Sequence, residues 1–161
     1  MESSIEEVVH CSFIENGLTL ALAESCTGGS ISASLTRKSG ASEYFLGSIV
    51  AYSNELKEKI LNVSPMTLKN KGAVSEQTVR EMLEGMIKIA PADYVMAISG
   101  IAGPGGGSLE KPVGTICMGI KGKENFMRVW TCKISGKREA VVRKSKDILL
   151  TNLWEYSIKN K

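Results

Sequence analysis

The apolar positions of the chain fall into short continuous runs that alternate with longer stretches of helical spacing. The short runs predict strands at about 18–23, 45–51, 93–99, 113–121 and 125–133. The stretches with helical spacing predict helices at about 3–15, 28–37, 54–61, 66–70, 75–89 and 137–158. The predicted order begins as strand, helix, strand, helix and ends in a pair of strands before the last helix, which is typical of an α/β protein.

Two turn signals refine this arrangement. Asn16-Gly17 follows the first helical stretch and predicts where that helix ends. Gly122 lies between the last two apolar runs and predicts a hairpin, which adds antiparallel pairing to a sheet that begins parallel. We therefore predict an α/β fold with a three-layer-like mixed sheet, helices on both faces, a parallel part and a C-terminal antiparallel hairpin. A length of 161 residues predicts one domain, spanning 1–161.

The composition excludes several classes of protein. With 43% hydrophobic and 23% charged residues, the chain has the make-up of a globular protein. Its 20 basic residues exceed its 17 acidic residues by only three, which is too small an excess to indicate a nucleic-acid partner. No apolar run approaches the ~18 residues of a membrane span, and segment 1–9 is acidic rather than basic. We expect no signal peptide, no membrane partner and a cytoplasmic location.

The cysteines and the single histidine do not predict a metal site. Cys11, Cys26, Cys117 and Cys132 lack the spacing of zinc ligands, and His10 is the one histidine of the chain. We expect reduced thiols, no bound metal and no cofactor.

The segment 23–29, Ala-Glu-Ser-Cys-Thr-Gly-Gly, lies between a predicted strand and a predicted helix. Ser25 or Thr27 is placed to cap that helix, and Gly28 and Gly29 allow the backbone to approach a ligand. Unpaired N–H groups would then point outward at the positive end of the helix dipole, where an anion or a developing oxyanion is stabilised. The alternative is a capped turn whose small residues serve only packing.

Two further segments follow predicted strands. Tyr52 lies at a strand exit, Ser53 or Asn54 is placed as a helix cap, and Lys57 lies in the first helical turn. The segment 99–108 is a glycine-rich loop, which is entropically costly to order unless it serves a ligand. Because ligands bind at the carboxyl ends of strands in open α/β sheets, we expect these segments to share a pocket with Ser25.

The ordered blocks of the chain are Ala23–Gly29, Tyr52–Asn54 with Lys57, Gly72–Ser75, Ser99–Pro104 and Lys111–Thr115. Together they resemble the C-terminal domain of the competence/damage-inducible protein CinA, from about Thr19 to Leu153. Stand-alone members of that family are nicotinamide-nucleotide amidohydrolases. Two-domain members carry a molybdopterin-binding-like domain ahead of this one, and because about twenty residues precede the matched blocks we expect that domain to be absent.

The resemblance implies hydrolysis of nicotinamide mononucleotide to nicotinate mononucleotide and ammonia. Its implied mechanism is of the Ser/Lys type: Ser25 attacks the amide, Lys57 takes the Ser25 proton and passes it to ammonia, and Tyr52 relays or positions that proton. The lysine must be brought toward neutrality by burial or a nearby cation, because an exposed lysine stays charged. His10 precedes the matched blocks, which argues against a Ser-His-Asp triad. The alternatives are a surface Lys57 within a charge pattern and a core Tyr52.

Two other residues compete with Ser25 as the nucleophile. Ser42 lies in a family-like block just before a predicted strand, and Cys26 would be the stronger nucleophile if a helix N-terminus lowered its pKa. We rank Ser25 first, Ser42 second and Cys26 third, because no histidine lies near Cys26 in the sequence.

Substrate binding requires groups for the phosphate and the ribose. The glycines of the 99–108 loop could form an anion nest and Thr115 could add a hydroxyl, while Arg138 and Arg143 match basic positions of the family. The residue before Arg138 is often acidic in the family but is Lys137 here. Glu24 would either orient Lys57 or act as an acid at the helix N-terminus. The expected substrate-binding residues are Glu24, Thr27, Gly28, Gly29, Ser42, Gly103, Gly105, Gly106, Thr115, Arg138 and Arg143.

Two other functions stay open at this point. A nucleotide-binding regulatory or competence-associated module would keep the pocket without turnover, and a different small-amide hydrolase would act on an unphosphorylated substrate. The last helix carries more apolar residues than one helix edge needs, so we also expect a homo-oligomer. These apolar residues are Ile148, Leu149, Leu150, Leu153, Trp154 and Ile158.

Overall fold

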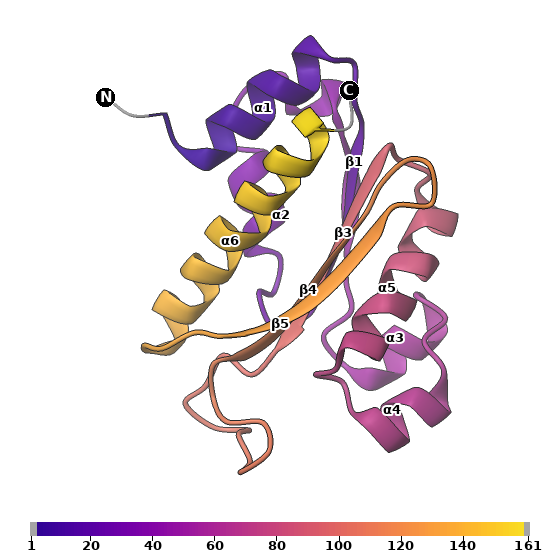
Figure 1. The fold of residues 1–161 in the computed structure, drawn as a ribbon, viewed down its shortest axis with the longest axis vertical. Helices are drawn as coiled ribbons and strands as arrows, with labels where there is room; N and C mark the ends of the chain where they lie inside the picture. The colour runs from indigo at the N-terminus through magenta and orange to yellow at the C-terminus, as the bar shows by residue number, and fades with distance from the viewer. Residues whose placement is uncertain (1–2, 160–161) are drawn as a thin grey trace.

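The computed structural model describes residues 3–159, which form one mixed sheet covered by helices on both faces (Figure 1). The strands are β1 (Leu20–Glu24), β2 (Phe45–Val50), β3 (Tyr94–Gly100), β4 (Thr115–Lys121) and β5 (Met127–Lys133). The α-helices are α1 (Ile5–Glu15), α2 (Ser30–Leu35), α3 (Asn54–Lys59), α4 (Pro65–Lys71), α5 (Glu76–Ile89) and α6 (Arg138–Lys159). A short 3₁₀ helix, η1 (Ala41–Glu43), precedes β2 and was not predicted from the sequence.

The strand order across the sheet is β2-β1-β3-β4-β5. β1 pairs in parallel with β2 on one side and with β3 on the other, whereas β4 runs antiparallel to both β3 and β5. Helices α1, α2 and α6 cover one face, and α3, α4 and α5 cover the other (Figure 1). The prediction of a mixed α/β sheet with a parallel part, an antiparallel hairpin and helices on both faces is therefore confirmed.

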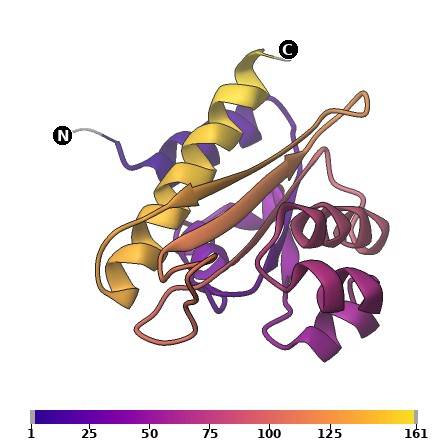
Figure 2. The same ribbon diagram turned by 60° about the horizontal axis from the view of Figure 1, so that its bottom comes forward.

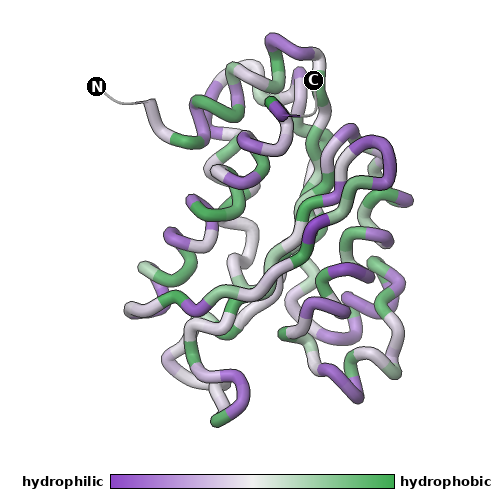
Figure 3. The backbone as a smooth tube through the Cα atoms, viewed as in Figure 1, coloured by the Kyte–Doolittle hydropathy of each residue, from purple (hydrophilic) through white to green (hydrophobic). Residues whose placement is uncertain are grey.

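The side chains of β1 point alternately to the two faces of the sheet, so they contribute to two separate core clusters. Leu20 and Leu22 pack with α1 and α6, whereas Ala21 and Ala23 belong to the cluster beneath α5. The small side chains on the α5 face allow that helix to approach closely, and a Cβ added at Gly119 of β4 would lie 2.7 Å from a methyl of Leu83. Apolar residues concentrate along the central strands, whereas apolar and polar residues alternate along the helices (Figure 3).

The helix and strand ends follow the local signals with one exception. Asn16 caps α1, the side chain of Ser53 accepts the backbone N–H of Leu56 at the start of α3, and the hairpin turns at Glu124–Asn125, just beyond Gly122. Helix α2, however, begins only at Ser30, with Gly29 as its N-cap. The expectation that Ser25 or Thr27 caps this helix is wrong.

One edge of the sheet gathers the segments singled out by the sequence. The parallel strands β1, β2 and β3 end at this edge, β4 begins there, and β5 ends there and leads into α6. The chain leaves β1 toward β2 on one side and reaches β3 on the other, so the end of β1 is the topological switch point of the sheet. Figure 2 shows the loops of this edge brought forward.

Among residues 3–159, no helix is both long and apolar enough to cross a membrane. No group of three or more His, Cys, Asp or Glu side chains within these residues is arranged to hold a metal ion.

Candidate active site

A cavity of about 190 Å³ opens at the carboxyl ends of β1, β2 and β3. Its centre is a contact between two residues 32 positions apart in the sequence, in which Lys57 Nζ lies 2.9 Å from Ser25 Oγ. The residues that line the cavity are Ser25, Cys26, Tyr52, Asn54, Lys57, Ala73, Val74, Ser99, Gly100, Ala102 and Arg138. The expectation that the segments around Ser25, Tyr52 and the 100–108 loop meet at one edge of the sheet agrees with this arrangement.

Lys57 is buried, with 1% of its surface exposed, which excludes the alternative of a solvated helix lysine. Its Nζ lies 2.8 Å from the carbonyl oxygen of Ala51 and 3.3 Å from that of Tyr52. No carboxylate of the described residues forms an ion pair with Lys57. Burial without a counter-ion disfavours the charged ammonium and lowers the pKa of Lys57.

The three oxygens around Nζ fit both protonation states of the lysine: the ammonium donates to all three, and the neutral amine, which burial favours, can donate to two and accept from the third. A neutral lysine has two N–H donors and one lone pair, whereas carbonyl oxygens can only accept a hydrogen bond. The carbonyls of Ala51 and Tyr52 therefore take the two N–H groups, and the hydroxyl of Ser25 is the group that can donate to the lone pair. This arrangement can deprotonate the Ser25 hydroxyl.

Main-chain hydrogen bonds fix the two halves of this dyad. The N–H of Ser25 donates to the carbonyl of Ile98 on β3, and the N–H of Ala51 donates to the carbonyl of Glu24 at the end of β1. The backbones that leave β1 and β2 are thereby held to their neighbouring strands. Ser53 then caps α3, so that Lys57 lies in its first turn and its side chain returns to Ser25.

Glu24 caps α2 from the preceding strand. Its Oε2 accepts the hydroxyl of Thr27 and the N–H groups of Gly29 and Ile31, and its Oε1 accepts both the N–H and the hydroxyl of Ser32. The side chain is fully buried. Of the two roles considered for Glu24, the structure shows the acid at the helix N-terminus.

This capping corrects the expected anion site at the two glycines. The N–H of Gly29 is occupied by Glu24, and the N–H of Gly28 donates to the carbonyl of Ser25. In contrast, the N–H groups of Cys26 and Thr27 donate to no other described residue. The unpaired donors next to Ser25 are therefore these two, and not the N–H groups of the glycines.

Arg138, the first residue of α6, crosses the mouth of the cavity. Its Nη1 donates to the carbonyl of Gly103 at 2.9 Å and its Nη2 donates to the hydroxyl of Tyr52 at 3.0 Å. Tyr52 is 58% exposed, so it is not a core aromatic. Its carbonyl contacts Lys57 while its ring and hydroxyl form the rim of the cavity.

Several predicted residues lie outside the cavity. Ser42 is exposed in η1, which precedes β2 and therefore lies at the opposite edge of the sheet from Ser25. Arg143 lines a separate hollow with Arg37 and Lys146. The structure does not bring Ser42 or Arg143 to Ser25, because strand direction and helix rotation separate them.

The glycine loop contributes in part. The carbonyl of Gly103 accepts a hydrogen bond from Arg138, but Gly105 and Gly106 are not among the residues that line the cavity. The hydroxyl of Thr115 donates to the carbonyl of Pro112 within the loop and is thus used internally. An anion nest formed by the loop remains a prediction.

Neither Cys26 nor His10 is suited to catalysis at this site. Burial raises the pKa of the Cys26 thiol to about 12, so the thiol stays protonated near neutral pH. His10 is buried on α1 and packs edge-on against Tyr44, which comes directly before β2 at the opposite edge of the sheet. A Ser-His-Asp triad at Ser25 is therefore excluded by position.

Sequence reasoning missed the wall of the cavity opposite the dyad and one polar residue beside it. Ser99, at the end of β3, donates to the carbonyl of Ala73 at 2.8 Å and holds the segment that includes Val74. The block Gly72–Ser75 carried a signal for this wall. Asn54 was considered only as a helix cap, yet it lines the cavity.

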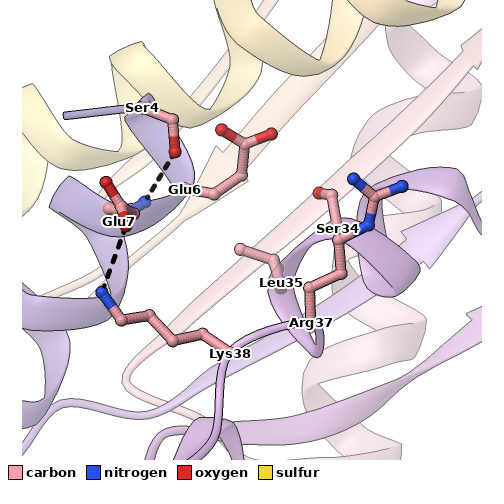
Figure 4. A pocket seen from close by; sticks show the side chains of 7 residues that line it. All are labelled: Ser4, Glu6, Glu7, Ser34, Leu35, Arg37 and Lys38. Atoms are coloured by element: carbon pink, nitrogen blue, oxygen red, sulfur yellow. Dashed lines mark hydrogen bonds and ion pairs between the residues drawn. The ribbon is translucent and has the colours of Figure 1, made fainter. Parts of the chain in front are cut away.

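A larger hollow of about 420 Å³ lies between α1 and α2, away from Ser25 (Figure 4). Its groups serve the fold: Ser4 accepts the N–H of Glu7 at the start of α1, and Glu7 pairs with Lys38. We therefore assign the candidate site to the smaller cavity, which contains the dyad.

Comparisons with known proteins agree with this architecture. The model of the CinA C-terminal domain matches residues 2–156. A CinA-like protein of Thermotoga neapolitana is 48% identical over 152 residues, which are 94% of this chain and 37% of that protein. A CinA-like protein of Chlorobium limicola is 41% identical over 159 residues, which are 96% of this chain and 37% of that protein. The chain spans little more than a third of these relatives.

Solved structures match over nearly their whole length. A competence or damage-inducible protein from Enterobacter asburiae has a TM-score of 0.90 at 36% identity, covering 96% of this chain and 99% of that one. The competence/damage inducible protein CihA from Agrobacterium tumefaciens has a TM-score of 0.89 at 34% identity, covering 95% of this chain and 97% of that one.

Proposed function

This chain belongs to the CinA C-terminal domain family, and from that premise we propose that it hydrolyses the carboxamide of nicotinamide mononucleotide. The products are nicotinate mononucleotide and ammonia, and the reaction recycles a pyridine nucleotide. The contact between Ser25 Oγ and the buried Lys57 amine, which has no carboxylate partner among the described residues, carries this proposal. An amide carbon is a poor electrophile, and this pair supplies an activated hydroxyl where water alone would be too weak.

The first half of the reaction forms an acyl-enzyme. Lys57 takes the hydroxyl proton while Ser25 Oγ forms a bond to the carboxamide carbon. The carbonyl oxygen becomes an oxyanion, and the N–H groups of Cys26 and Thr27 stabilise it. As the C–N bond breaks, the lysine ammonium returns its proton to the nitrogen, and ammonia leaves.

The second half regenerates the enzyme. A water molecule attacks the ester carbon, and Lys57 accepts its proton as the new C–O bond forms. The bond between the carbon and Ser25 Oγ then breaks, and the proton passes from Lys57 to Ser25. Tyr52 positions Lys57 through its main-chain carbonyl, and no cofactor takes part in these steps.

The cavity sets where the substrate lies. No Asp or Glu lines it, while Arg138 contributes positive charge at its mouth, which favours an anionic substrate. A volume of about 190 Å³ is smaller than a whole nucleotide site requires, so the cavity accommodates the carboxamide end of the molecule. The ribose phosphate then extends past the rim toward Arg138 and the glycine loop.

A homo-oligomer built on α6 has less support from the structure. Leu149, Leu150 and Leu153 are fully buried within the chain, because α6 packs on β4 and on α1. Of the other apolar residues of that set, Ile148 and Trp154 are half-buried against the core and Ile158 is 37% exposed. The oligomeric state is tested directly by light scattering during size-exclusion chromatography. We also propose a cytoplasmic location, where the nucleotide substrate is present.

The deciding experiment measures ammonia release from nicotinamide mononucleotide by the wild type, Ser25→Ala and Lys57→Ala, with EDTA present throughout. We expect turnover by the wild type and a loss of about 10³-fold or more in each folded variant. Tight binding without wild-type turnover would identify a binding module instead. Faster turnover of nicotinamide riboside than of the mononucleotide would identify a hydrolase of unphosphorylated amides.

A further inference from the structure

Lys57 is a buried amine whose charge, when it is protonated, no protein anion neutralises. Its side chain is buried, and no carboxylate of the described residues forms an ion pair with it. The three contacts of its Nζ are uncharged oxygens of Ser25, Ala51 and Tyr52. A buried ammonium without a counter-ion attracts an anion, whereas a neutral amine does not. The affinity of this site for a negative group therefore depends on whether Lys57 carries a proton.

Few other charged or titratable groups face Lys57. Burial raises the pKa of the Cys26 thiol to about 12, so that the thiol stays neutral, and Arg138 at the mouth stays protonated. The hydroxyl of Tyr52 accepts a hydrogen bond from Arg138. Glu24 is turned toward the start of α2, where its oxygens accept hydrogen bonds. The opposite wall of the cavity is uncharged, being formed by Ala73, Val74 and Ser99. The other charged side chains of α3 lie outside the cavity: Glu55, Glu58 and Lys59. The charge inside the cavity is thus set by the proton on Lys57.

The proposed reaction itself brings an anion to this place. Hydrolysis of the acyl-enzyme gives a carboxylic acid whose carbon has just left Ser25 Oγ, about 3 Å away. Because Lys57 Nζ lies 2.9 Å from that oxygen, the carboxyl group is within about 6 Å of the amine. A carboxylic acid, with an ordinary pKa of ~4, is a far stronger acid than a lysine ammonium, so the acid gives its proton to the neutral amine. The carboxylate product then faces an ammonium and supplies the counter-ion that the protein does not.

We propose that Lys57, besides acting as the base, discriminates the acid product from the amide substrate through its own charge; this inference rests on the function proposed above. In the ammonium form Lys57 holds the carboxylate by Coulomb attraction, which requires no particular hydrogen-bond geometry. In the neutral form that attraction is absent and the acid leaves. The carboxamide has no negative charge, so the substrate gains nothing from the ammonium. Inhibition by the product is therefore strongest at low pH and fades as the pH rises.

Calorimetry of the wild type with nicotinate mononucleotide tests this without turnover. Titrations between about pH 6 and about pH 10, in two buffers with different heats of ionisation, give the affinity and the number of protons taken up on binding. We expect the affinity to fall by about 10-fold or more as the pH rises, with net proton uptake where free Lys57 is neutral. In steady-state kinetics, KM for nicotinamide mononucleotide should not rise over the same range.

Two lysine variants on the same helix serve as the comparison. Lys57→Met removes the amine but keeps an unbranched side chain, so only the titration of the ligand phosphate, near pH ~6, should remain. Lys59→Met removes an exposed lysine that pairs with Glu55 and should behave as the wild type.

The outcomes separate the inference from the function on which it rests. The same pH dependence in wild type and Lys57→Met, in an enzyme that releases ammonia, would overturn the inference alone. If Lys57→Met does not fold, the proton count of the wild type decides, and no uptake at any pH contradicts the inference. Absence of ammonia release by the wild type, measured separately, would overturn the proposed function itself.

Discussion

Arg138 Nη2 donates a hydrogen bond to the hydroxyl of Tyr52 at 3.0 Å, although 86 positions separate the two residues in the chain. The same guanidinium holds the carbonyl of Gly103. The last helix, the exit of β2 and the glycine loop are thereby joined at the rim of one cavity, and the energetic consequence of this contact can be measured.

Replacing Arg138 tests its role at the rim. Arg138→Ala removes positive charge and two hydrogen bonds beside the expected phosphate, so we expect KM for nicotinamide mononucleotide to rise by roughly 10-fold or more. Arg143→Ala is the matched control, because it removes the same charge from another hollow of α6. Steady-state kinetics for both variants check this, and equal effects of the two substitutions would contradict the assignment.

The pH dependence of turnover reports the state of Lys57. Because burial lowers the pKa of this lysine, the active neutral amine forms at a lower pH than in an exposed lysine of pKa ~10.4. We expect kcat/KM to rise with pH along a limb whose midpoint lies below that value. Measuring kcat/KM across the pH range tests this. The control is the binding of a non-hydrolysed analogue, which should not change with pH, and a kcat/KM midpoint at the ordinary lysine pKa would contradict the prediction.

Stability should depend on pH through the same group. The unfolded chain binds the Lys57 proton up to its ordinary pKa, whereas the folded chain releases it at a lower pH. The free energy of unfolding therefore gains a contribution as the pH rises through the window from the lowered pKa to about 10.4. Urea unfolding of wild type and Lys57→Met at several pH values measures this gain, which should be absent from the variant.

Glu24 should be more important to stability than to chemistry. Glu24→Ala removes a buried carboxylate that accepts five hydrogen bonds and leaves several donors of α2 unpaired. We expect the free energy of unfolding to fall by about 3 kcal/mol, at the upper end for a lost cap. Glu24→Gln should lose less, because it keeps one acceptor oxygen. A change below about 0.5 kcal/mol in urea unfolding of Glu24→Ala would contradict this role.

The rival nucleophiles can be separated by substitution. Ser42→Ala should retain turnover within about 2-fold, because Ser42 lies at the other edge of the sheet. Cys26→Ala should also retain turnover, because its thiol is protonated and the N–H that stabilises the oxyanion belongs to the main chain. Loss of activity in folded Ser42→Ala, with Ser25→Ala still active, would reverse the ranking.

Gly85 on α5 tests the packing that supports the site wall. A Cβ there would lie 1.8 Å from the carbonyl oxygen of Leu61. Alanine favours a helix over glycine by about 1 kcal/mol, but a clash with main chain outweighs that gain. We expect Gly85→Ala to lower the melting temperature by several degrees, whereas Gly105→Ala, with no atom within 4 Å, should be neutral.

The local patterns were sufficient for the order of elements. The apolar periodicity located the five strands and six α-helices of the described residues, and it placed Ser25 and Tyr52 correctly after strands and Lys57 correctly in the helix that follows. These features depend on residues within a few positions of one another, so the sequence encodes them directly. The 3₁₀ helix Ala41–Glu43 has no such period and was missed.

Only the tertiary structure decided which polar groups remain free for chemistry. The glycines after Ser25 predicted open N–H groups, but the carboxylate of Glu24 reaches across the turn and occupies the N–H of Gly29. Likewise, the resemblance to basic positions of the family could not distinguish Arg138 from Arg143. The two arginines lie on the same helix but line different hollows. Hydrogen-bond partners, burial and helix rotation are set by long-range packing. The sequence therefore determined which residues could act, and the fold determined which of them meet.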